Sequence, residues 1–215
     1  MESRGVPVIR YADDIVVLSR TPRAGQRLLE SSRRYLEGKL KLRMNMEKSR
    51  VVSVYAIRNF KFLGFALGKG KNGAFIRAHA KSLKKAKQKL KELTSRSQGR
   101  NVRKVMYNVK VFIRGWLGYF GIASMRNTMK SWDEWLRRRF RMYIWKQWKL
   151  PRTRVKNLIK LGMPVWMAHR NGNTRRGYWA VAGSGILTHT ITNERLVRAG
   201  YYSIFDRYES LHLCD

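Results

Sequence analysis

The chain has 215 residues and carries 47 Lys plus Arg against 13 Asp plus Glu, a formal net charge of +34. So large a positive charge predicts a polyanionic partner, because self-repulsion otherwise works against a compact fold. A hydrophobic content of 44% with seven Trp, ten Tyr and eight Phe excludes a disordered basic tail, and the single Cys214 excludes a disulfide framework and a Cys-based zinc site.

The first predicted element is a β-hairpin that carries an acidic pair. The apolar runs Val6–Ile9 and Ile15–Leu18 are short and rich in β-branched residues, which favours two strands. Tyr11 and Ala12 precede Asp13 and Asp14 between these runs, so we expect both aspartates in a tight turn. Carboxylates held side by side suit a hard cation such as Mg²⁺. Asp-Asp is also ordinary turn chemistry, and these residues alone leave both interpretations open.

The next segments predict an antiparallel sheet with one covering helix. Thr21-Pro22 is typical of a helix start and Gly38 of its end, with apolar residues between them at helical spacing. Alternation over Leu40–Met46 predicts a half-buried strand. Further strands are predicted at Val51–Tyr55, Asn59–Leu67 and Ala74–Arg77, with a turn at 68–73.

From residue 78 onward the patterns become helical. Residues 78–95 predict a lysine-rich helix, followed by a loop at 95–99 and by long apolar stripes over 102–120 and 129–144. Pro151 is expected to stop the latter helix, and shorter helices are predicted at about 153–161 and 192–199, ended by Gly162 and Gly200. The predicted fold class is therefore α+β: a partial antiparallel sheet with one covering helix, then an all-α region.

Basic side chains are the candidates for contact with nucleic acid. A charge run is usually a solvated face, but the helix at 78–95 has Glu92 as its one acidic residue, so it cannot be a helix laced with ion pairs. Arg-rich segments beside Tyr178 and Trp179 suit RNA, which is read through phosphates and stacked bases. The Trp residues at 132, 135 and 145 are assigned mostly to the core. The predicted RNA-binding residues are Lys81, Lys84, Lys85, Lys87, Lys89, Lys91, Arg114, Arg137, Arg138, Arg141, Arg175 and Arg176.

Several blocks, in order, resemble the reverse transcriptase/maturase family encoded by group II introns. Tyr11-Ala12-Asp13-Asp14 resembles the active-site hairpin of reverse transcriptases. The later blocks resemble the rest of the palm and then the maturase region. They are Leu40–Ser49 with its Asn-x-Glu-Lys-Ser end, Phe60–Phe65 with its Phe-Leu-Gly-Phe end, the Arg-Gly-Trp helix of 113–120, Arg176–Trp179, Asn193–Leu196 and Asp206–Tyr208.

The resemblance implies roles for individual residues. Asp13 and Asp14 would be two of three acids holding Mg²⁺ for two-metal phosphoryl transfer, with Asp13 the more direct ligand. Lys48 would neutralise or protonate departing pyrophosphate, or else be a surface lysine. Tyr11 would lie near the primer end, or face the core. Gly64 would allow close approach of the backbone to the primer, or mark a bulge.

The resemblance also predicts the organisation of the chain. Residues 1–77 would be the C-terminal part of the palm, 78–125 thumb-like basic helices and 126–215 a maturase domain that binds RNA. The fingers and the first catalytic acid are expected to lie outside this chain. The parent protein would copy RNA into DNA and promote intron splicing, whereas the alternative is a maturase that only binds RNA.

Partners and location follow from the same interpretation. We expect structured intron RNA and an RNA/DNA primer-template as partners, with dNTPs in the complete enzyme, and the sequence leaves a homodimer open. Residues 1–5 contain no apolar signal region, and no run approaches the ~18 apolar residues that span a bilayer. This predicts a soluble, cytoplasmic protein of bacterial type with no membrane partner.

Overall fold

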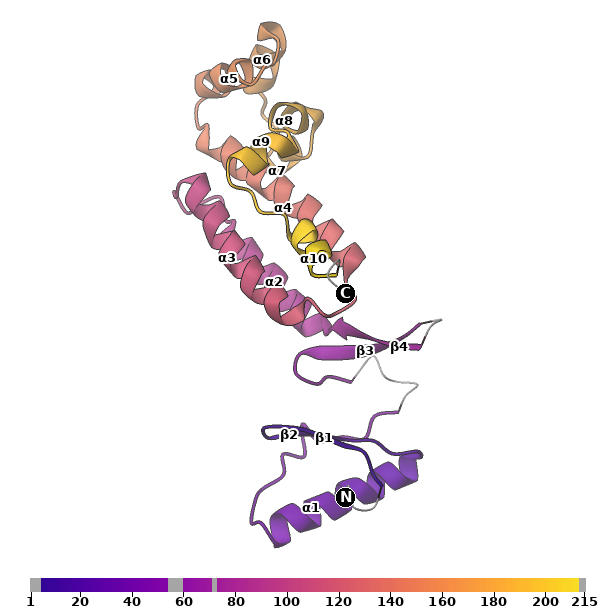
Figure 1. The fold of residues 1–215 in the computed structure, drawn as a ribbon. Coiled ribbons are helices and arrows are strands. Elements are labelled where there is room, and N and C mark those ends of the chain that lie inside the picture. The colour runs from indigo at the N-terminus through magenta and orange to yellow at the C-terminus, as the bar shows by residue number, and fades with distance from the viewer. Residues whose placement is uncertain (1–4, 54–59, 71–72, 213–215) are drawn as a thin grey trace. The chain divides into compact units, whose positions relative to one another are not determined.

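The computed structural model describes residues 5–53, 60–70 and 73–212. The chain divides into two compact units, Met1–Phe75 and Ile76–Asp215. The first contains short strands and one helix, and the second is helical (Figure 1). The predicted α+β class is confirmed.

The first unit begins with the predicted hairpin. Strands β1 (Val8–Tyr11) and β2 (Asp14–Val17) pair in antiparallel register, with Val8 opposite Val17 and Tyr11 opposite Asp14. Helix α1 (Pro22–Gly38) follows and is confirmed at both ends. The Thr21 hydroxyl accepts a hydrogen bond from the Ala24 amide at 3.1 Å, and this satisfies one of the free amides of the first turn.

The predicted strand over Leu40–Met46 is wrong. Instead of pairing with a neighbour, the chain folds back onto the end of α1, where the Leu42 amide donates to the Leu36 carbonyl at 2.9 Å. Lys41 adopts a left-handed conformation with φ of +56° in this reversal. The alternation of apolar residues therefore does not correspond to a buried face, and Leu40 is 51% exposed.

The remaining strands of the first unit are also shorter than predicted. Residues 51–53 form no strand, while 54–59 lie outside the described residues. The next strand, β3, occupies Phe65–Gly70 instead of Asn59–Leu67. It pairs with β4 (Gly73–Ala78), which confirms the strand predicted at Ala74–Arg77. The predicted turn at 68–73 begins too early, because β3 continues to Gly70.

The second unit is organised around three long helices, α2 (Ala80–Leu93), α3 (Val102–Phe120) and α4 (Arg126–Gln147). Their apolar stripes supply much of the core, including Leu90, Ile113, Leu136 and Phe140, each fully buried. The three helices were predicted correctly, because apolar residues at helical spacing indicate a helix that buries one face against the core.

Shorter helices complete the second unit. They are α5 (Pro151–Lys160), α6 (Val165–Gly172), α7 (Tyr178–Ala182), α8 (Gly185–Thr190), α9 (Asn193–Arg198) and α10 (Ile204–His212). Helices α7 and α10 pack on α4, and α5 packs on α6 (Figure 1). The helices predicted near 153–161 and 192–199 are confirmed, but α4 ends before Pro151, which begins α5 instead of stopping α4.

Candidate active-site hairpin and nucleic-acid interface

The acidic pair lies at the tip of the β1–β2 hairpin. Two residues, Ala12 and Asp13, form the turn, and Asp14 is the first residue of β2, so the prediction that both aspartates occupy the turn is wrong in this detail. Ala12 has φ of +52°, which non-glycine residues rarely adopt. Arg10 Nε donates to the Ala12 carbonyl at 3.0 Å and holds this conformation in place.

Both carboxylates are open to solvent. Asp13 and Asp14 are exposed, and neither accepts a hydrogen bond from a described residue. Their oxygens are therefore free for an external ligand. Mg²⁺ typically takes one or two carboxylates and completes its shell with water and substrate phosphates, so this pair fits such an ion. Among the described residues, no group of three or more His, Cys, Asp or Glu side chains is placed to hold a metal.

Tyr11, Lys48 and Gly64 occupy distinct parts of the first unit. Tyr11 pairs with Asp14 and is 63% exposed, so its ring is not a core residue. Lys48 is exposed, and its amide donates to the Asn45 side chain at 3.2 Å in a turn. Gly64 has φ of +80° in a two-residue turn between Phe62 and Phe65, which is neither a bulge nor a flat strand.

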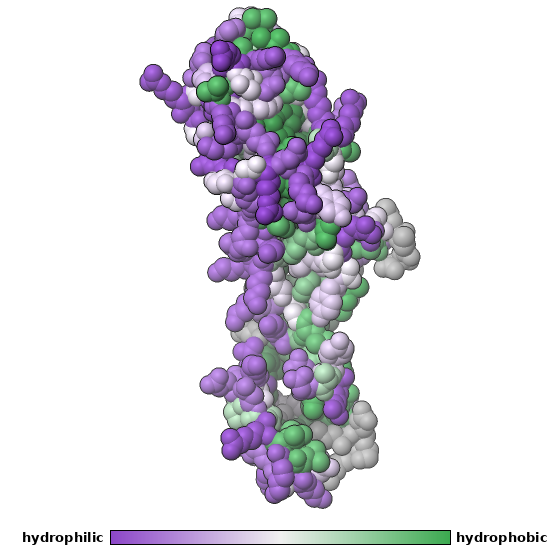
Figure 2. Space-filling model, turned by 90° about the vertical axis from the view of Figure 1, so that its left-hand side faces the viewer, coloured by the Kyte–Doolittle hydropathy of each residue, from purple (hydrophilic) through white to green (hydrophobic). Residues whose placement is uncertain are grey.

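Helix α2 presents a continuous basic face. The six predicted lysines are all exposed, while Ala86 and Leu90 on the opposite side are buried. Lys87 lies over the Trp135 ring at 5.5 Å, and Lys89 approaches Glu92 at 3.9 Å on the surface. Figure 2 shows that hydrophilic side chains cover most of the visible face of the helical unit. The geometry of α2 suits contact with phosphates.

The arginines of α4 are mostly used inside the protein. Arg141 is only 7% exposed, and it donates to the Ile191 carbonyl at 2.8 Å and to Asn193 Oδ1 at 2.9 Å. Burial lowers the pKa of Arg141, and the nearby Arg137 guanidinium lowers it further. Arg141 was predicted to bind RNA, and in the structure its guanidinium joins α4 to Ile191 and to Asn193, the first residue of α9.

Two further arginines of α4 also have internal partners. Arg137 Nη1 donates to the buried Asp133 carboxylate at 2.6 Å. Arg138 lies over the Trp179 ring at 4.0 Å and donates to the Trp179 carbonyl at 2.8 Å. One face of the Trp179 ring is thus occupied by an arginine of its own chain, while the side chain remains 38% exposed.

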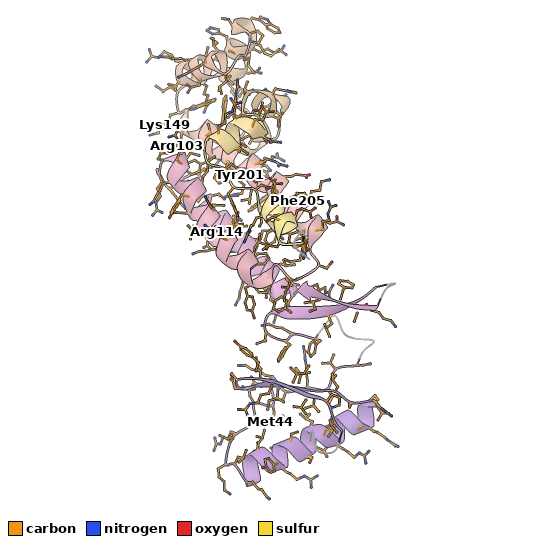
Figure 3. All side chains as sticks on the ribbon, viewed as in Figure 1. Met44, Arg103, Arg114, Lys149, Tyr201 and Phe205 are labelled. Atoms are coloured by element: carbon orange, nitrogen blue, oxygen red, sulfur yellow. The ribbon has the colours of Figure 1, made fainter. Side chains whose placement is uncertain are left out.

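The other predicted RNA-binding arginines are exposed. Arg114 lies on α3 (Figure 3), and Arg175 and Arg176 lie in the connection before α7. Sequence reasoning missed Arg96, Lys146 and Arg154, which surround the Tyr178 ring. No local signal marks them, because they are far apart along the chain, and only the packing of the α2–α3 connection, α4 and α5 brings them together.

Comparison with known proteins finds one family match in each of the two units. Residues 1–67 match the reverse transcriptase (RNA-dependent DNA polymerase) family, and residues 83–162 match the group II intron, maturase-specific domain. No curated protein matches the chain. No helix of the described residues combines the length and apolar character needed to cross a membrane.

The first match includes the acidic hairpin, and the second includes α3, α5 and most of α2 with its basic face. A polymerase segment followed by a maturase segment defines a class of proteins that copy RNA and also bind it. The chain belongs to the group II intron reverse transcriptases/maturases. The general functions of its two parts are reverse transcription and intron splicing, with nucleic acid such as intron RNA as the partner.

Proposed function

We propose that this chain binds structured RNA through its helical unit and contributes the Asp13–Asp14 pair to RNA-templated DNA synthesis on a primer. The observation that supports the catalytic part is the tip of the β1–β2 hairpin. Its two carboxylates are exposed, and no side chain or amide of the described residues donates a hydrogen bond to them. The residues 1–67 that match reverse transcriptases include this tip.

Asp13 and Asp14 would hold Mg²⁺, which supplies charge neutralisation for the phosphates of a dNTP and activates the attacking oxygen of the primer. The residues around the turn contribute by positioning the two carboxylates. The Arg10 contact to the turn and the β1–β2 register keep the two carboxylates at one place. Tyr11, Lys48 and Gly64 are proposed to lie near the primer end and the nucleotide, with Lys48 facing the departing pyrophosphate.

Primer extension on an RNA template tests the catalytic part. The Asp13→Ala variant should lose dNTP incorporation by about two orders of magnitude or more, as expected when a transition-state charge loses its stabilisation. Glu30→Ala is the matched control, because Glu30 is an exposed acid on α1 of the same unit. If the unsubstituted chain extends the primer and both variants do so equally well, Asp13 is not a metal ligand.

RNA binding is tested separately by filter binding over a salt series. The exposed lysines of α2 should release counterions from the RNA, so affinity should fall by about three orders of magnitude between about 50 and 200 mM salt if six or more phosphates are contacted. An affinity that does not change with salt would contradict this part of the proposal while leaving the hairpin's role intact.

A further inference from the structure

Cationic side chains from separate elements surround the ring of Tyr178, the first residue of α7. The guanidinium carbon of Arg96 lies 4.7 Å from the ring centroid, Lys146 Nζ lies 5.0 Å away, and the guanidinium carbon of Arg154 lies 5.8 Å away. They come from the α2–α3 connection, α4 and α5. These four residues are named here the Tyr178 cluster.

The cations of the cluster lack acidic partners. No carboxylate among the described residues forms an ion pair with Arg96, Lys146 or Arg154. Arg154 is fixed in place, because its Nε donates to the Trp148 carbonyl at 2.9 Å and its guanidinium carbon lies 4.7 Å from the Trp145 ring. Arg96 and Lys146 donate no hydrogen bond within the described residues and keep their N–H groups for a ligand.

The Tyr178 ring attracts the three cations only weakly. A cation–π contact at the surface contributes about 0.5–1 kcal/mol. Because the three cations also repel one another, the gain from the ring is reduced. An anion bound beside these cations is attracted to each of them, and its charge offsets their mutual repulsion. Because cations lie over the ring, Tyr178 orients them and does not stack on a base.

We infer that the Tyr178 cluster binds a phosphodiester group of the RNA strand, an inference that rests on the proposed RNA-binding function. The surface around the cluster supports a strand over a free anion. Arg175 and Arg176 are exposed and come just before Tyr178, and they extend the positive surface beyond the cluster. A polynucleotide can follow such a surface from one phosphate to the next, whereas one small anion would use only part of it.

The double variant Arg96→Gln with Lys146→Gln tests the site, since glutamine removes the charge and keeps most of the length. Lys156→Gln with Lys160→Gln is the matched control: both lysines are exposed on α5 and the net charge changes equally. In filter binding over a salt series, the cluster variant should lose affinity about tenfold, and its salt slope should fall by about 0.7–0.9, the value for one lost phosphate contact. The control should change far less.

Variants of the ring test its positioning role. Tyr178→Phe keeps the ring and should bind RNA like the unsubstituted chain, whereas Tyr178→Leu should bind as weakly as the double variant while its circular dichroism spectrum is unchanged. If Tyr178→Leu unfolds, the double variant and Tyr178→Phe still decide the matter, because both leave the core intact.

Three outcomes would overturn the inference or its basis. If the cluster and control variants lose equal affinity while the unsubstituted chain binds RNA with a steep salt slope, the cluster is not a phosphate site and the proposed function stands. If the unsubstituted chain shows no salt-dependent RNA binding, the proposed function itself fails. If a dNTP binds and loses affinity in the cluster variant while RNA binding does not change, the ligand is a free nucleotide.

Discussion

At the scale of single residues, the buried Asp133 carboxylate of α4 binds three partners. Its Oδ1 accepts hydrogen bonds from the Tyr201 hydroxyl at 2.7 Å and the Ile204 amide at 3.0 Å, and its Oδ2 faces Arg137. Tyr201, labelled in Figure 3, comes from the connection between α9 and α10. One buried carboxylate therefore fastens the C-terminal segment to α4, and buried charges of this kind persist only when they are paired.

Asp133→Ala should destabilise the protein by about 3 kcal/mol or more, because it leaves the Arg137 charge and two buried donors without their acceptor. Urea denaturation followed by circular dichroism measures the change. The adjacent and exposed Glu134→Ala serves as control and should cost less than about 0.5 kcal/mol. Similar costs for the two variants would show that the Asp133 contacts do not stabilise the fold.

Tyr201 makes stability depend on alkaline pH. Burial raises the pKa of Tyr201, and the Asp133 carboxylate raises it further. The folded state therefore retains the hydroxyl proton above pH ~10, where an unfolded tyrosine releases it. The free energy of unfolding should thus fall as pH rises beyond ~10, by at most about 1.4 kcal/mol per pH unit from this group.

The Tyr201→Phe variant checks this pH dependence. It should be less stable at neutral pH, but its free energy of unfolding should fall less steeply between pH ~9 and ~11. Burial also raises the pKa of Tyr143, so part of the alkaline loss should remain. An unchanged slope would mean that Tyr201 ionises as readily in the folded chain as in the unfolded one.

At the scale of elements, hydrogen bonds and an ion pair hold α10 against the start of α4 and the residues just before it. The Tyr208 hydroxyl accepts from the Met125 amide at 2.9 Å and donates to the Ala123 carbonyl at 2.9 Å. Arg126 Nη2 pairs with Glu209 at 3.0 Å, and its guanidinium carbon lies 5.4 Å from the Phe205 ring. These contacts fix a short helix that has few turns of its own to stabilise it.

Tyr208→Phe should cost about 1–3 kcal/mol, because the Met125 amide and the Ala123 carbonyl both lose a partner in a buried place. Tyr107→Phe is the matched control, since Tyr107 lies on α3 and is 58% exposed. Hydrogen exchange of the α10 amides offers a local measurement: they should lose protection in Tyr208→Phe and keep it in the control. Unchanged protection would mean that apolar packing alone holds α10.

At the scale of the whole molecule, the net charge of +34 works against folding. Few of the lysines and arginines have acidic partners, and the ion pairs found among the described residues are mostly on the surface, where each contributes little. Stability is therefore expected to depend on the ionic surroundings more strongly than in a protein of balanced charge.

The thermal midpoint should rise when salt is increased from about 20 to 200 mM, because screening weakens the self-repulsion. RNA should raise the midpoint further than salt of equal ionic strength, since it binds the folded state. Differential scanning fluorimetry measures both effects. A midpoint that falls with added salt would show that favourable ion pairs, and not repulsion, dominate the electrostatics.

The elements that sequence predicted correctly are those whose signal is local. The β1–β2 strands follow from short β-branched runs, α1 from Thr21-Pro22 and Gly38, and α2 to α4 from stripes at helical spacing. The strand over Leu40–Met46 failed, because alternation predicts a strand only where a neighbouring strand pairs with it, and here the chain caps α1 instead. Helices α6, α7, α8 and α10 are too short to show a clear stripe.

The sequence by itself determined the positive charge, the acidic hairpin with its aspartates and the order of blocks that resemble the intron-encoded family, since each is a property of neighbouring residues or of composition. Only the tertiary structure decided which cations remain free for RNA. Arg141 and Arg137 are bound internally, whereas Arg96 and Lys146 meet at Tyr178 with their N–H groups free. The physical reason is that burial and the partner of a charge depend on contacts between residues tens of positions apart.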